Sequence, residues 1–160
     1  MGEAEFGLKK GIISTRPGWL GKVEVVEVKF DPRVTTYNDL AKVAATKRCA
    51  EPIFACTPAQ KKVALKYTKR VQDRGAGKIR WVQDNKYYMS QGALKYLPVT
   101  ETQATRINAG LTQTSYWLSP GQKALLKKIK ANPKTKWPTA IGQPFAKAWS
   151  AAMSVAKKLK

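Results

Sequence analysis

The 160-residue sequence contains no histidine. This absence excludes Ser-His and Cys-His catalysis, the usual zinc ligand sets and the commonest general base in proteins. Cysteine is also scarce, because Cys49 and Cys56 are the only two in the chain. Two cysteines are too few for a disulfide framework or a structural zinc site. We therefore expect no metal site, while one disulfide or two free thiols both remain open.

Long apolar segments are missing as well. No run approaches the ~20 residues that a membrane-spanning helix needs, and no signal peptide is visible at Met1. We therefore expect no transmembrane segment. By default we expect a cytoplasmic protein, with a targeting segment upstream of Met1 left open.

Acidic residues are few and unevenly placed. Thirty Lys and Arg residues outnumber ten Asp and Glu residues, which gives a net charge of +20. All ten acidic residues lie at or before Glu101, so residues 102–160 carry eleven basic residues and no acidic one. This distribution predicts that the C-terminal part is attracted to polyanions such as nucleic acid, anionic lipid or an acidic partner.

Hydrophobic periodicity and helix-start signals predict a mixture of strands and helices. Thr57 and Gln60 have the spacing of a capping box, and they begin a helix that Gly75 would end. Two similar starts follow at Thr100 and Ser119. The remaining expected elements are strands within 21–32, 51–56 and 77–84 and helices within 35–46, 86–97 and 145–160. Their mixed order is typical of an α+β or α/β domain.

Glu24 is the most unusual residue of the first strand. Side chains two apart along a strand share a face, so Glu24 is expected on the face of Val26 and Val28. A desolvated carboxyl there would keep its proton near neutrality, as a general acid requires. The alternative is a glutamate at the end of the strand that turns to solvent or pairs with a lysine. The pattern alone leaves both interpretations open.

Other candidate residues have plainer interpretations. Cys56 follows Ile53 and Phe54 and is expected to be a small buried residue. Cys49 follows two cations that favour its thiolate, although an unreactive thiol is the more frequent outcome. Trp19 lies in a predicted turn, where it is expected to lie over the core. A cationic stretch could bind phosphate, but a solvated helix face is favoured; it consists of Lys62, Lys66, Lys69 and Arg70.

The stretch GIISTRPGWLG is followed closely by VEVVEVKFDP. Together they resemble two segments of the peptide methionine sulfoxide reductase A family, Gly-Val-x-Ser-Thr-x-x-Gly-Tyr and His-Ala-Glu-Val-Val-x-Val-x-Phe/Tyr-Asp-Pro. PIFACTPAQKKVA resembles Ala-Ile-Phe-Tyr-Thr-x-x-x-Gln-x-x-x-Ala, and KYYMS and TQATRINAGL resemble later segments of the family. The likeness runs in order over residues 2–111, and the first block is its most specific part.

The resemblance implies a fold and a chemistry. In this family a cysteine of Gly-Cys-Phe-Trp attacks the sulfoxide sulfur, and a buried glutamic acid protonates the oxygen with help from tyrosine hydroxyls. Another thiol then resolves the sulfenic acid. Glu24 matches the acid, Trp19 stands in place of one tyrosine and is expected to form a wall of the substrate pocket, and Cys49 stands near the other tyrosine as a resolving or pocket thiol.

The sequence departs from the family pattern at the nucleophile, because the Cys-Phe-Trp motif would precede Gly2 and is absent. Two explanations remain open. Either an upstream gene segment encodes this motif, with cysteine or selenocysteine, or the chain has kept the fold and lost the chemistry. We therefore expect an α+β fold, with a reductase-like domain at 1–111 and a basic helical extension at 112–160. The 160-residue chain is expected to be inactive.

For an active form, the resemblance implies methionine sulfoxide in peptides or proteins as the substrate. It also implies thioredoxin or a small dithiol as the reductant, without a bound cofactor. The alternative function comes from another class: a non-catalytic protein that binds nucleic acid or another polyanion through residues 112–160.

Overall fold

The computed structural model describes residues 2–47, 52–75, 77–82 and 86–159. The chain forms two compact units, Met1–Val82 (unit 1) and Gln83–Lys160 (unit 2). Unit 1 combines an antiparallel three-stranded sheet and a parallel pair of strands with helices, whereas the elements of unit 2 are helical. The expected α+β class is thereby confirmed. Within the described ranges, no helix is long and apolar enough to cross a lipid bilayer.

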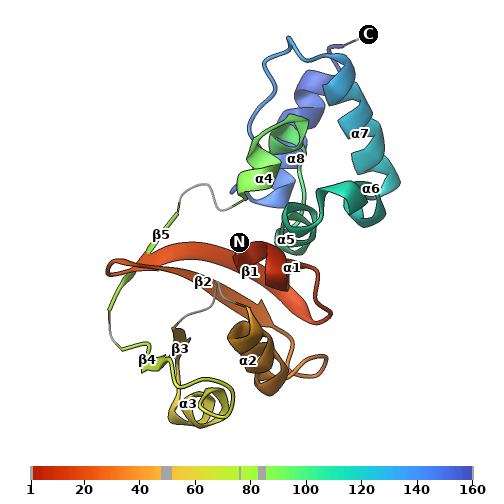
Figure 1. The fold of residues 1–160 in the computed structure, drawn as a ribbon. Coiled ribbons are helices and arrows are strands. Elements are labelled where there is room, and N and C mark those ends of the chain that lie inside the picture. The colour runs from red at the N-terminus through yellow and green to blue at the C-terminus, as the bar shows by residue number, and fades with distance from the viewer. Residues whose placement is uncertain (1, 48–51, 76, 83–85, 160) are drawn as a thin grey trace. The chain divides into compact units, whose positions relative to one another are not determined.

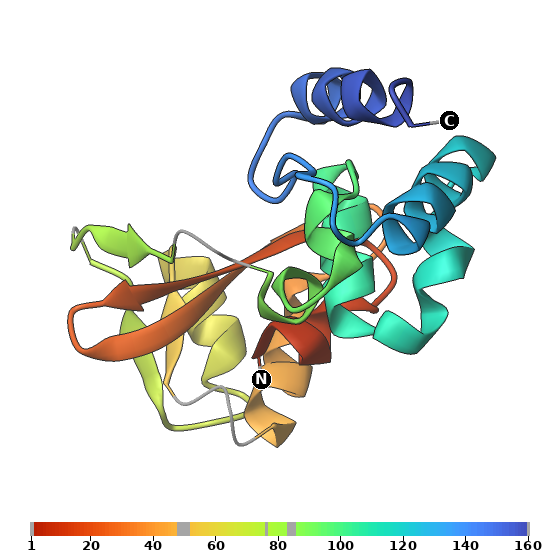
Figure 2. The same ribbon diagram turned by 90° about the horizontal axis from the view of Figure 1, so that it is seen from above.

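The main sheet of unit 1 has the strand order β2-β1-β5, with β1 (Ile12–Leu20), β2 (Val23–Phe30) and β5 (Ile79–Trp81). Both pairings are antiparallel. Figures 1 and 2 show β1 and β2 as a long hairpin. Gly21 in its two-residue loop has φ of 60°, which suits the first position of a type II′ turn. The sequence analysis predicted β2 and β5 but not β1.

Two helices pack on one face of this sheet. Helix α1 (Gly2–Gly7) contributes Phe6, and α2 (Tyr37–Thr46) contributes Leu40 and Ala44. These side chains form a core cluster with the buried Ile12, against which Val28 also packs. Thr36 and Asp39 form a reciprocal capping box that fixes the start of α2.

A small β-α-β segment completes unit 1, with β3 (Ile53–Ala55), α3 (Pro58–Ala64) and β4 (Val71–Asp73). Strands β3 and β4 are parallel. The predicted helix extending to Gly75 is therefore wrong, because α3 ends at Ala64 and residues 71–73 pair with β3 instead. Thr57 caps α3 as predicted, but the Gln60 side chain accepts from the amide of Cys56 (2.9 Å).

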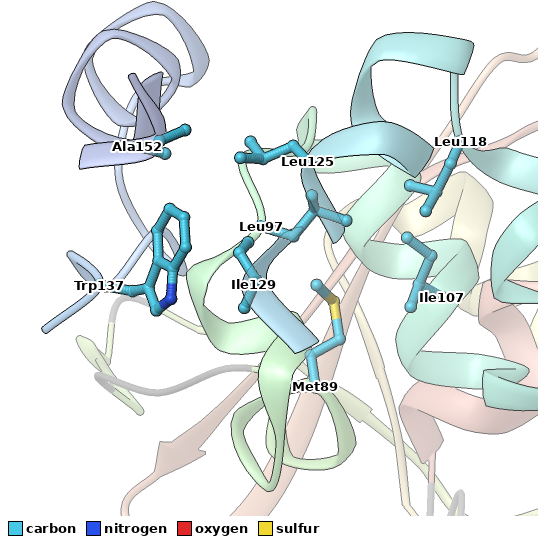
Figure 3. Close-up of a cluster of buried hydrophobic side chains, with 9 residues drawn as sticks. Met89, Leu97, Ile107, Leu118, Leu125, Ile129, Trp137 and Ala152 are labelled. Carbon is cyan, nitrogen blue, oxygen red and sulfur yellow. The ribbon is translucent and has the colours of Figure 1, made fainter. Parts of the chain in front are cut away.

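Unit 2 is built from short helices around a single core. Its elements are α4 (Tyr87–Ser90), η1 (Ala93–Tyr96), α5 (Glu101–Ala109), η2 (Leu111–Gln113), α6 (Thr114–Trp117), α7 (Pro120–Ala131) and α8 (Phe145–Ala156). Figure 3 shows their apolar side chains converging; they are Met89, Leu97, Ile107, Leu118, Leu125, Ile129, Trp137 and Ala152. The predicted capping boxes at Thr100 and Ser119 are both present.

The boundary between the compact units differs from the predicted domain boundary at 111/112. Met89, Leu97 and Ile107, all from the N-terminal side of that boundary, share one core with Leu125 and Ile129 of α7. Their burial places residues 86–109 in the same packing unit as the basic C-terminal helices. The extent of the family resemblance, residues 2–111, stays a separate prediction.

Candidate functional site

The candidate site lies at the hairpin end of the main sheet. Trp19 of β1 pairs in register with Glu24 of β2 on one side and with Arg80 of β5 on the other. Residues directly opposite one another across antiparallel strands share a face of the sheet. The structure therefore brings two of the predicted site residues, Trp19 and Glu24, side by side.

Glu24, Trp19 and Arg80 form a row of paired residues across the three strands. The sequence analysis did not predict Arg80 as a member of this row. Its guanidinium lies over the Trp19 ring, 5.8 Å from the ring centroid, which is within the range of a cation–π interaction. The segment 77–84 was predicted as a strand, but nothing in its sequence indicates that it pairs with β1. This contact could be predicted only if it were known that β5 lies beside β1 in the sheet.

The opposite face of the sheet repeats this pairing of an arginine with a tryptophan. Gly18 pairs with Trp81, and the Arg16 guanidinium lies 4.4 Å from the centroid of the Trp81 ring. A side chain at Gly18 would collide with neighbours on β5, because a Cβ there would lie 2.8 Å from the Ile79 side chain and 2.9 Å from Trp81. Glycine at this position therefore lets β5 pack closely beside β1.

Glu24 shares the face of Val26 and Val28, as the alternation predicts, but it is exposed. Of the two interpretations that the pattern left open, the described structure agrees with a glutamate at the end of the strand that turns to solvent, and not with the buried acid that the resemblance implies. Glu24 is the second residue of β2, beside the hairpin loop, and Val23 before it is exposed as well. Within the described residues Glu24 forms no ion pair.

Helix α1 begins over the same face, close to this row. A Cβ built on Gly2 would lie only 2.9 Å from a methyl carbon of Val26, two residues along β2 from Glu24. At the next residue of α1, the Thr15 hydroxyl donates a hydrogen bond of 2.9 Å to the Glu3 carboxylate. The close approach of Gly2 to Val26 and this hydrogen bond place the first turn of α1 against the strands that carry Trp19 and Glu24.

Only one of the two cysteines, Cys56, lies within the described residues. Cys49 lies outside the described residues, so its predicted role as a resolving or pocket thiol stays a prediction. Cys56 is exposed, and its predicted burial is wrong because β3 ends at Ala55, before it. Burial raises the pKa of the Tyr37 hydroxyl, and the nearby Cys56 raises it further when ionised.

The donor groups of the described residues do not assemble a metal centre. No group of three or more Cys, Asp or Glu side chains within ranges 2–47, 52–75, 77–82 and 86–159 could hold a metal ion. No family model matches the chain, and no curated protein matches it.

Proposed function

We propose that unit 1 is a domain of the peptide methionine sulfoxide reductase A type, in which Trp19 and Glu24 line the place of the sulfoxide group. The observation that carries the proposal is the pairing of Trp19 with Glu24 on the face where α1 begins. An aromatic ring can pack against the methyl group of the substrate, while a carboxylic acid can protonate the departing oxygen.

In this proposal, a thiol or selenol outside the present sequence supplies the nucleophile. It attacks the sulfoxide sulfur, Glu24 gives a proton to the oxygen, and the oxygen passes to the nucleophile as a sulfenic or selenenic acid. Methionine is released, and a dithiol such as thioredoxin reduces the oxidised nucleophile with loss of water. Residues joined ahead of Gly2 would enter beside Val26, two residues from Glu24 on the same face.

The exposure of Glu24 bears on the activity of the chain as it stands. Glu24 is exposed to solvent in the described structure, whereas catalysis by a general acid is favoured in a closed site from which water is excluded. In this proposal the 160 residues by themselves supply neither the nucleophile nor a cover for Glu24. A preceding segment together with the bound substrate would supply both.

The test compares the natural chain with a variant that carries Gly-Cys-Phe-Trp ahead of its sequence. Both are incubated with a peptide containing methionine sulfoxide and with dithiothreitol, and the methionine formed is measured by mass spectrometry. We expect turnover from the extended chain and none from the natural chain. An extended chain that keeps the circular dichroism of the natural one but reduces no sulfoxide would contradict the proposal.

A further inference from the structure

Helix α7 presents three lysines on one exposed face. Lys123, Lys127 and Lys130 follow one another at intervals of four and three residues, and all three are exposed. This spacing aligns side chains along one stripe of a helix. We call these three residues the lysine face. In Figure 1, α7 forms an edge of unit 2.

The charge of the lysine face is not neutralised within the described part of the protein. Residues 86–159 contain twelve Lys and Arg residues but one acidic residue, Glu101, so their net charge is +11. None of the three lysines has a carboxylate partner among the described residues. Two more exposed lysines, Lys134 and Lys136, follow directly after the helix.

Lys128 shows what a structural lysine looks like in the same helix. It lies on another side of α7, and its ammonium donates hydrogen bonds to the carbonyl oxygens of Ala156 (2.7 Å) and Leu159 (2.9 Å). These bonds satisfy carbonyls at the C-terminal end of α8, where cations are favourable. Among the residues that the structure describes, the lysine face makes no comparable hydrogen bond, so its cations remain available to a partner.

We propose that the lysine face binds the phosphate backbone of nucleic acid without reading its base sequence. A helix rises about 1.5 Å per residue, so neighbouring lysines are about 4.5–6 Å apart along its axis. Phosphates follow one another at about 3.4 Å along the axis for each strand of DNA. Successive lysines can therefore reach successive or alternate phosphates, and each neutralised phosphate releases counterions.

Two other anionic partners fit the structure less well. A helix that lies on a membrane inserts its apolar face into lipid, but Leu125 and Ile129 on the apolar face of α7 are 4% and 2% exposed, in the core. An acidic protein would be expected to use aromatic or aliphatic anchors beside the charges. The exposed apolar neighbours of the lysine face within α7 are small, namely Ala124 and Ala131.

The proposal concerns unit 2 and does not rest on the reductase proposal for unit 1. Its test measures binding of the full chain to a short fluorescent duplex DNA by anisotropy at several salt concentrations. The test variant is K123Q/K127Q/K130Q, because glutamine keeps the helix propensity of lysine while removing the charge. The matched control is K62Q/K66Q/K69Q, which removes the same charge from exposed lysines of unit 1.

We expect the natural chain to bind the duplex and to lose affinity steeply as salt rises. The triple variant of the lysine face should bind at least about tenfold more weakly near 0.1 M salt, with a salt slope reduced by roughly 2–3. The control should retain most of the affinity. Circular dichroism of both variants should match that of the natural chain.

Several results would overturn the proposal. Equal loss of binding in both triple variants would mean that the net charge of the protein drives binding and that the lysine face is not a specific binding surface. Absence of binding near 0.1 M salt would exclude a nucleic-acid role for this face. Equally tight binding to phosphatidylglycerol vesicles or to poly-glutamate, lost in the same variant, would assign the face to lipid or to acidic protein instead.

Discussion

The two units cap their helices with the same geometry but with different chemistry. In unit 1 the capping box of α2 uses a carboxylate, Asp39, as the partner of Thr36. In unit 2 the corresponding boxes of α5 and α7 use neutral amides, Gln103 and Gln122. Both side-chain types can accept from the N-cap amide. The amides stabilise the helix starts of unit 2 without adding negative charge to its basic surface.

Ion pairing differs between the units in the same direction. Unit 1 pairs several of its cations with carboxylates, as in Lys61–Asp73 (2.6 Å) and Lys47–Glu5 (2.9 Å). In unit 2 the polar contacts run between amides and backbone carbonyls: the Gln122 amide donates to the Pro98 carbonyl (2.9 Å) and to Gln103 (3.0 Å). The comparison indicates that neutral amides take the place in unit 2 that carboxylates take in unit 1, while the lysine face has no carboxylate partner among the described residues.

The largest expected effect tests where one unit ends and the other begins. Ile107 is fully buried in the core of unit 2, although it lies within the predicted domain 1–111. Ile107→Ala should lower the free energy of unfolding of unit 2 by about 2–5 kcal/mol, because it leaves a cavity. Amide hydrogen exchange should become faster in α7 and α8 and stay unchanged in the β1–β2 hairpin.

Ile12→Ala is the matched control for this experiment, since Ile12 is 2% exposed in the core of unit 1. It should accelerate exchange in the hairpin and leave α7 and α8 unchanged. If Ile107→Ala instead loosened the hairpin and spared α7, the division of the core between the two units would be incorrect.

A second, smaller effect tests whether a neutral amide is required in the capping box of α7. Gln122 is 2% exposed and donates to two oxygens, so Gln122→Glu would place a carboxylate against them without a donor. We expect a loss of about 1–3 kcal/mol in the free energy of unfolding at neutral pH. Burial should raise the pKa of the new carboxyl, so the loss should shrink as the pH falls and the carboxyl gains a proton.

Chemical denaturation of both proteins over a range of pH would measure this difference. Gln113→Glu is a suitable control, because Gln113 is exposed. A Gln122→Glu variant as stable as the natural chain at neutral pH would show that the buried amide network does not require its donors.

The smallest effect is the response of the two kinds of cap to acid. Hydrogen bonds from the Thr36 hydroxyl (2.6 Å) and amide (3.2 Å) lower the pKa of Asp39 below its ordinary value of 3.8. The ionised Asp39 carboxylate therefore contributes fully to the stability of the folded protein at pH values above its ordinary pKa. This contribution is lost as the pH falls through the lower pKa that Asp39 has in the folded protein. Amide exchange at the start of α2 should accelerate below about pH 4 relative to α7, after correction for intrinsic rates.

Asp39→Asn should remove this acid response, because an amide does not titrate in this range. An acid response of the same size at the starts of α2 and α7 would contradict the distinction between the carboxylate and amide caps.

Local signals in the sequence predicted the parts of the fold that depend on neighbouring residues. The capping boxes at Thr100 and Ser119 need only a glutamine three positions later, and both form as predicted. The predicted helix after Thr57 failed beyond Ala64, because pairing with β3 decides the conformation of residues 71–73. That pairing joins segments far apart in sequence, so periodicity within one segment could not reveal it.

The candidate site shows the same limit. Alternation along β2 correctly predicted that Glu24 shares a face with Val26, since this depends on strand geometry alone. Its exposure depends on the packing of other elements at the loop end of the hairpin, which a strand pattern does not contain. The alignment of Arg80 with Trp19 depends likewise on which strands pair.

The central claim is that the face of β2 that carries Glu24 provides the chemistry of unit 1. The most direct test is turnover of methionine sulfoxide by the Cys-Phe-Trp-extended chain with Glu24→Gln and, as its control, Glu27→Gln on the opposite face of the same strand. The account predicts that Glu24→Gln lowers turnover by about 100-fold or more, as expected for loss of a general acid, while Glu27→Gln retains most of it. Full turnover with Glu24→Gln, or an equal loss in both variants, would contradict it.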